Sequence, residues 1–105
     1  MTSLQYRENA YESEFAHQEE LKFRAREKAV KALAAWAAER LGKAGDAAES
    51  FAAEVVAADV THRKLEETLG QVAEALAPAG IGRAEVDRML DRLLAQAEAA
   101  VRAVK

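Results

Sequence analysis

Apolar residues recur at helical spacing through the first half of the chain. One stripe of them, spaced 7-3-4-4, consists of Phe23, Val30, Leu33, Ala37 and Leu41. Steps of three, four and seven residues return to the same side of an α-helix, so the stripe predicts a buried helix face. No Gly or Pro interrupts the stretch from Glu14 to Leu41, which we therefore expect to form one continuous helix ended by Gly42. Trp36 flanks the stripe and is expected in the core.

Two shorter helices are predicted next. Asp46 and Glu49 stand three residues apart, the spacing of a capping box, and predict a second helix that reaches about Ala58. Residues 59–61 are expected to be a short connection. The apolar side of the second helix contains Phe51, Ala52, Val55 and Val56. A third helix, expected to end before Pro78, has 4-3-4 spacing at Leu65, Leu69, Val72 and Leu76.

A last helix and the overall composition complete the fold prediction. Ile81 is expected to join the core from the loop after Pro78, and a fourth helix should run from Arg83 to Val104. Its buried side consists of Val86, Leu90, Leu93, Ala97, Val101 and Val104. Good helix formers dominate the composition, with one Pro and five Gly in 105 residues. The predicted fold class is all-α, a four-helix bundle with a long first helix and a flexible N-terminal arm.

The N-terminal residues lack the regular stripe that the rest of the first helix carries. Leu4, Tyr11 and Phe15 share one side of a helix, but that side is rotated from the later stripe. An isolated helix shorter than about 12–15 residues is marginal in water. We therefore expect residues 1–20 to form a flexible arm and residues 21–105 to form the bundle. The aromatic residues of the arm are candidate anchors for a pocket in a partner protein, and packing back onto the bundle is the alternative.

Charge is divided unevenly along the first helix. Residues 1–20 carry one Arg and five Glu, a net charge of −4, whereas residues 21–31 carry five Lys or Arg and one Glu, a net charge of +4. The favoured interpretation is a solvated helix face with internal ion pairs such as Glu20–Arg24 and Glu27–Lys31, and contact with a partner is the alternative. The whole chain has a net charge of −3, which gives no electrostatic reason to expect a nucleic-acid partner.

The sequence contains no recognisable constellation for catalysis or metal binding. His17 and His62 lie far apart in the sequence, and both are expected at the surface. The Ser and Thr hydroxyls are expected to lack a His or Asp partner, so no nucleophile is predicted. The sequence therefore predicts no enzyme, no metal site and no cofactor. Zero Cys and no run of about 20 apolar residues indicate a cytoplasmic protein that does not insert into a membrane.

Four blocks of residues carry a resemblance to a known family. In chain order they are Phe15-Ala16-His17, Glu19–Phe23, Leu33–Gly42 and Ala52–Asp59. Over essentially its whole length the chain resembles the zeta subunit of alphaproteobacterial F-type ATP synthases. The resemblance implies a four-helix bundle whose N-terminal arm inhibits ATP hydrolysis. It implies that the arm folds into a helix between the catalytic alpha and beta subunits and against the central gamma shaft, with the protein bound to the cytoplasmic head.

The apolar pattern of the arm and the resemblance together indicate which residues of the arm contact the ATP synthase. These partner-binding residues are Leu4, Tyr6, Arg7, Glu8, Tyr11, Phe15 and His17. Arg7 and Glu8 match the family pattern, whereas Leu4-Gln5-Tyr6 stands where family members commonly have Phe and two Asp. We expect the apolar side chains to become buried at the partner while the charged ones set the register. The alternatives are a helical adaptor and a bundle that binds adenine nucleotide with weak or no inhibition, for which the sequence shows no motif.

Overall fold

The computed structural model describes the backbone of residues 3–103 and the side chains of residues 16–103. It contains four α-helices, α1 (Ser3–Arg40), α2 (Gly45–Thr61), α3 (Leu65–Leu76) and α4 (Arg83–Ala103). A single 3-10 turn, Ala77–Ala79, joins α3 to α4, and residues 3–103 contain no β-strand. The all-α, four-helix fold predicted from the sequence is confirmed.

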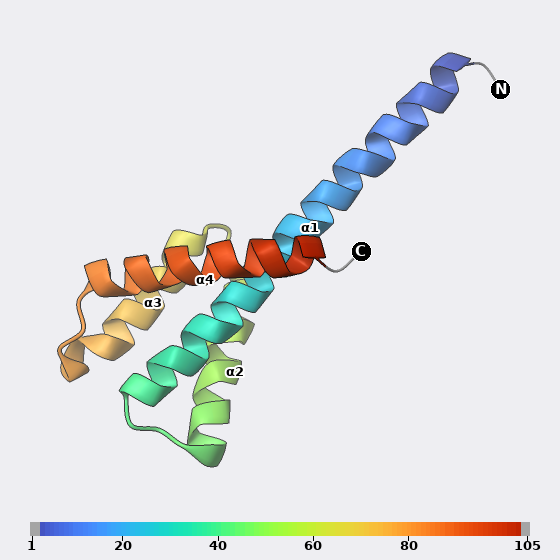
Figure 1. Ribbon diagram of the computed structural model, residues 1–105. Coiled ribbons are helices and arrows are strands. Elements are labelled where there is room, and N and C mark those ends of the chain that lie inside the picture. The colour runs from blue at the N-terminus through green and yellow to red at the C-terminus, as the bar shows by residue number, and fades with distance from the viewer. Residues whose placement is uncertain (1–2, 104–105) are drawn as a thin grey trace.

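The bundle is built around the C-terminal half of α1. The other three helices all contact α1, and its N-terminal half extends beyond them, so the molecule measures 62 × 24 × 22 Å (Figure 1). Small residues line much of the packed side, which lets the neighbouring helices approach closely. Within residues 16–40 of α1, the buried residues are Ala25, Ala29, Val30, Leu33, Ala34, Ala37 and Ala38. The helix begins at Ser3 and not at Glu14, because most of the residues between them are good helix formers and none is Gly or Pro.

The end of α1 confirms the role predicted for Gly42. The Lys43 amide donates to the Ala38 carbonyl at 2.9 Å, and the Gly42 amide donates to the Glu39 carbonyl at 3.0 Å. These two bonds are those of a Schellman motif, which requires a left-handed residue after the helix. Gly42 has φ 75°, a conformation that costs glycine little because it has no Cβ.

Two aromatic residues of α1 are less buried than the apolar pattern predicts. Trp36 is half-buried and packs against the core from its edge. Phe23 was expected in the core but is 60% exposed. It lies beside Val56 and Val60 in the last turns of α2, where the bundle ends. The helical period assigns Phe23 to the same side of α1 as buried Val30, but it carries no information on how far α2 extends.

The second helix differs from its prediction at both ends. It begins at Gly45, and the N-cap residue Ala44 makes no side-chain bond, so the capping box expected from Asp46 and Glu49 does not form. Asp46 lies in the first turn, where its negative charge suits the positive end of the helix dipole. Residues 59–61 are the last turn of α2 and not a connection, and Thr61 Oγ1 donates to the Ala58 carbonyl at 2.8 Å.

The last two helices follow the predicted pattern closely. Helix α3 ends at Leu76, before Pro78, and Ile81 is buried in the core at 6% exposure. Of the residues predicted on the buried side of α4, Leu93 is half-buried and Val104 lies outside the described residues. The remaining four are buried, Val86, Leu90, Ala97 and Val101. No helix within residues 3–103 has the length and apolar character that crossing a membrane would require.

Candidate functional site

The predicted contact residues lie on the N-terminal half of α1. Helical backbone continues unbroken from Ser3 into the bundle, so the stretch to Glu20 spans about 26 Å at 1.5 Å per residue. This half of α1, blue in Figure 1, projects away from the other helices. His17 is exposed, as predicted. The side chains of the other predicted contact residues lie outside the described part of the chain: Leu4, Tyr6, Arg7, Glu8, Tyr11 and Phe15.

Exposed ion pairs mark the point where the acidic arm meets the basic segment. Arg24 lies 2.7 Å from Glu20, and Lys22 lies 3.6 Å from Glu19. The first of these is one of the two predicted pairs, whereas the other predicted pair, Glu27–Lys31, does not form among residues 16–103. Exposed pairs of this kind contribute roughly 0–1 kcal/mol, so a partner can replace them at little cost.

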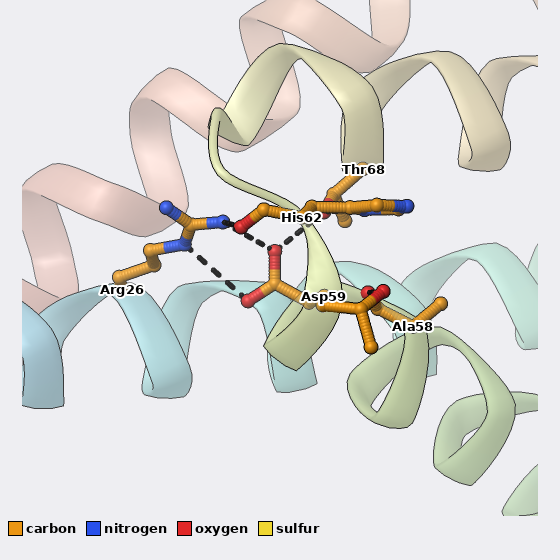
Figure 2. Close-up of polar contacts among 6 residues, drawn as sticks. Arg26, Ala58, Asp59, His62 and Thr68 are labelled. Carbon is orange, nitrogen blue, oxygen red and sulfur yellow. Dashed lines mark hydrogen bonds and ion pairs between the residues drawn. The ribbon is translucent and has the colours of Figure 1, made fainter.

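Three helices are joined by a polar network at the end of the bundle nearest the arm (Figure 2). Arg26 of α1 donates through Nη2 to Asp59 Oδ1 of α2 at 2.8 Å and through Nε to Asp59 Oδ2 at 3.3 Å. Thr68 of α3 donates its hydroxyl to Asp59 Oδ1. His62 Nδ1 lies 2.8 Å from Thr68 Oγ1, which is left to accept a hydrogen bond from the imidazole N–H because the hydroxyl proton points to Asp59. We call Arg26, Asp59, His62 and Thr68 the junction network.

The junction network keeps the buried carboxylate of Asp59 charged. Asp59 is 8% exposed and Thr68 is fully buried. Burial by itself raises the pKa of Asp59, but hydrogen bonds from Arg26 and Thr68, with the positive field of Arg26, outweigh it and hold that pKa below its usual value. The ionised carboxylate is therefore the form that joins α1, α2 and α3.

The junction network corrects four predictions made from the sequence. Arg26 was expected on a solvated basic face, Asp59 in a loop, and His62 at the open surface. No hydroxyl was expected near a His or Asp, yet Thr68 bonds to both. One signal in the sequence was available, because Asp59 stands four residues after buried Val55 and Thr68 stands four residues before buried Val72. Polar residues in the phase of a core stripe indicate a buried polar contact.

The arrangement of the junction network does not suit catalysis. Thr68 gives its proton to the carboxylate and not to the imidazole, which is the reverse of what an activated nucleophile requires. Its side chain is also fully buried, so no substrate reaches it. Among residues 16–103 no group of three side chains is arranged to hold a metal ion. The network therefore acts as a structural tie between helices.

A groove lies between α1 and α4, close to the base of the arm. It has a volume of about 350 Å³ and is lined by Arg24, Glu27, Lys28, Lys31, Ala100 and Val101. The charged side chains come from α1 and the small apolar ones from α4. Its three cationic side chains outnumber the one carboxylate, Glu27, so the groove, with apolar surface from Ala100 and Val101, suits an anionic ligand with an apolar part.

Comparison with known proteins places the chain in a family. No curated protein and no solved structure matches it. The family described as ATPase inhibitor subunit zeta matches residues 1–100, which include the projecting half of α1, the junction network and nearly all of α4. The match therefore covers the arm as well as the bundle, as the resemblance in the sequence predicted. With nearly the whole chain matched, the protein belongs to the ATPase inhibitor subunit zeta family.

Proposed function

We propose that this protein blocks ATP hydrolysis by an F-type ATP synthase by inserting its arm, residues 1–20, between the alpha and beta subunits and against the gamma shaft. A family of inhibitor subunits is regulatory and not enzymatic, and its members bind the ATPase that they inhibit. The main support for the proposal is the shape of α1, because its N-terminal half extends as a helix beyond the other three helices (Figure 1). Such an extension reaches into a partner while the bundle stays outside it.

The bundle lowers the free-energy cost of forming a helix in the arm. Starting a helix is the unfavourable step, whereas extending an existing helix adds one hydrogen bond for each residue ordered. The packed part of α1 is firmly held, because Ala25, Ala29 and Val30 are each 1% exposed. The arm therefore extends from a helix that is already formed. On insertion it buries Leu4, Tyr11 and Phe15, while its charged residues set the register.

Deleting residues 1–18 tests the proposal, because the deletion removes the predicted contact residues and leaves the packed part of α1 intact. Inhibition of ATP hydrolysis by the purified catalytic head should be lost. If the truncated chain inhibits as well as the intact chain, the bundle makes the inhibitory contact and the proposal is wrong.

A pair of double substitutions provides a control of equal chain length. Tyr11→Ala with Phe15→Ala removes the aromatic side of the arm and should weaken inhibition strongly. Asn9 and Ser13 fall on the opposite side of a helix by its 100° period, so Asn9→Ala with Ser13→Ala should leave inhibition nearly unchanged. Equal effects of the two pairs would show that the arm does not bind through its aromatic side.

The groove between α1 and α4 favours a second function, binding of an adenine nucleotide by the bundle. Its three cationic side chains suit the phosphates, and the apolar surface of Ala100 and Val101 suits the base. Titration with ATP, followed by amide chemical shifts, should move the resonances of residues lining the groove. Lys28→Ser with Lys31→Ser should abolish these shifts, whereas Lys43→Ser with Lys64→Ser, two exposed lysines outside the groove, should preserve them. Unchanged spectra of the intact chain would exclude this function.

A further inference from the structure

Phe23 and Val60 form an exposed apolar surface where the arm leaves the bundle. Phe23 on α1 is 60% exposed and Val60 on α2 is 77% exposed, and they are the large apolar side chains that stand exposed in residues 16–103. Together with half-buried Val56 they line one shallow hollow of about 130 Å³. We call Phe23, Val56 and Val60 the junction patch. Large exposed apolar side chains that gather in one place, from different helices, indicate an interaction surface.

Most of the polar groups around the junction patch are already bonded to one another. Arg26, Asp59 and His62 line the same hollow, and all three belong to the junction network. The remaining charged residue of the lining, Glu27, is exposed to solvent. A partner that covers the patch therefore does not leave the residues of the network without their bonds. The occupant suited to the hollow is an apolar side chain of a protein, because the hollow offers aromatic and aliphatic surface.

The junction network also fixes the position of Phe23, on α1, relative to Val56 and Val60, on α2. Arg26 stands three residues after Phe23 on α1, and Asp59 is the neighbour of Val60 on α2. The ion pair between Arg26 and Asp59, with Nη2 2.8 Å from Oδ1, holds the two helices together beside the hollow. A surface held in this way loses little conformational freedom on binding, which favours affinity.

The position of the junction patch, beside the arm, favours the partner of the arm as its occupant. Phe23 stands three residues beyond the end of the arm on the same unbroken helix, a rise of about 5 Å. We propose that the junction patch is a second contact with the ATPase, in which an apolar side chain of the head that receives the arm packs between Phe23 and Val60. This inference rests on the proposed function. The arm provides inhibition, and the patch provides affinity by holding the bundle beside the entry point of the arm.

Substituting the junction patch tests the inference through binding, separately from inhibition. The test variant is Phe23→Ser with Val60→Ser, and Asp91→Ser with Arg92→Ser, two exposed residues on α4, is the control. Val60→Ser alone serves as a second test variant should the double variant unfold. Each chain is labelled and titrated with the purified catalytic head, and the Kd is read from fluorescence anisotropy.

The junction-patch variant should bind at least about tenfold more weakly than the intact chain, which corresponds to about 1.4 kcal/mol. Inhibition at saturating concentration should be unchanged, and the control should match the intact chain in both measurements. A chain lacking residues 1–18 should keep weak binding to the head, and the patch substitutions should abolish that binding.

Two results would overturn the inference. In the first, the patch variant binds the head as tightly as the intact chain. In the second, sedimentation shows that the intact chain dimerises through the patch while head binding is unaffected, which assigns the patch to a second copy of the chain. Full inhibition by the chain lacking residues 1–18 would instead contradict the proposed function of the arm. The Kd values would still decide whether the patch binds the head.

Discussion

Asp59 is a carboxylate enclosed by a guanidinium from α1 and a hydroxyl from α3. Each of its two oxygen atoms accepts at least one bond, so its negative charge is compensated where water is largely excluded. Removing one partner from such a pair leaves the other without compensation, and that loss is larger than the net contribution of the pair itself. Single substitutions in the junction network should therefore have clear effects on stability.

Asp59→Asn should destabilise the fold by about 2 kcal/mol, because it leaves Arg26 without a counter-charge in a half-buried site. The free energy of unfolding in urea measures the effect. Glu54→Gln removes an exposed carboxylate from the same helix and should change stability by no more than about 0.5 kcal/mol. Equal losses in the two variants would mean that the junction network contributes no special stability.

Asp59 should also make the protein less stable in acid. Its pKa is lower in the folded state than in the unfolded state, so its contribution is complete above the unfolded pKa of about 3.9 and is lost as the pH falls through the folded pKa. Unfolding free energies measured between about pH 2.5 and 6 should decline more steeply in acid for the natural chain than for Asp59→Asn. Parallel pH profiles would contradict this assignment.

Burial also predicts which of two apolar substitutions on α1 causes the larger loss of stability. Leu33 is fully buried, so Leu33→Ala should cost about 3 kcal/mol. Trp36 is half-buried, and its truncation should cost less than the roughly 3–5 kcal/mol expected for an aromatic residue in a closed core. Chemical unfolding of the two variants, followed by circular dichroism so that loss of the Trp does not matter, checks the order. A larger loss for Trp36→Ala would show that this side chain is a central part of the core.

Helix α1 combines a packed half and a projecting half in one continuous element. Its packed half ends at Gly42, whose left-handed backbone turns the chain toward α2. A Cβ at Gly42 would meet nothing within 4 Å, so backbone strain is the sole obstacle to a larger residue there. The helix end therefore allows backbone strain to be tested apart from packing.

Gly42→Ala should destabilise the protein by about 1 kcal/mol, because alanine disfavours the left-handed conformation. The control is Gly82→Ala, since Gly82 has open space around its Cβ position and no positive φ. Thermal and urea unfolding of both variants should show a clear loss for the first and little change for the second. Similar results for the two glycines would mean that the Schellman turn adapts to a side chain.

At the scale of the whole molecule, the N-terminal half of α1 projects beyond the other helices, and we expect it to be separable from the packed bundle (Figure 1). Deleting residues 1–18 should change the free energy of unfolding by no more than about 0.5 kcal/mol, because among the described side chains of α1, those of residues 16–40, the buried core residues begin at Ala25. Calorimetry of the truncated and full-length chains measures this difference. A truncated chain that fails to fold would show that the arm belongs to the core.

The sequence by itself determined the helices, most of the core and the family. Steps of three and four residues correctly identify the buried faces of α3 and α4 because those faces follow from the helical period alone. Gly42 marks the end of α1 because the left-handed backbone conformation at that position strongly favours glycine. The contact residues of the arm came from its apolar pattern and from resemblance to the zeta family, and their roles stay predictions.

Only the tertiary structure decided the junction network and the junction patch. The helical period assigns Phe23 to a face of α1, but its exposure depends on where α2 ends beside it. Arg26, Asp59 and Thr68 come from three helices, and periodicity within one helix does not say which residue of another lies opposite. Partners across helices are set by how the helices pack against one another, and that packing is a property of the folded chain as a whole.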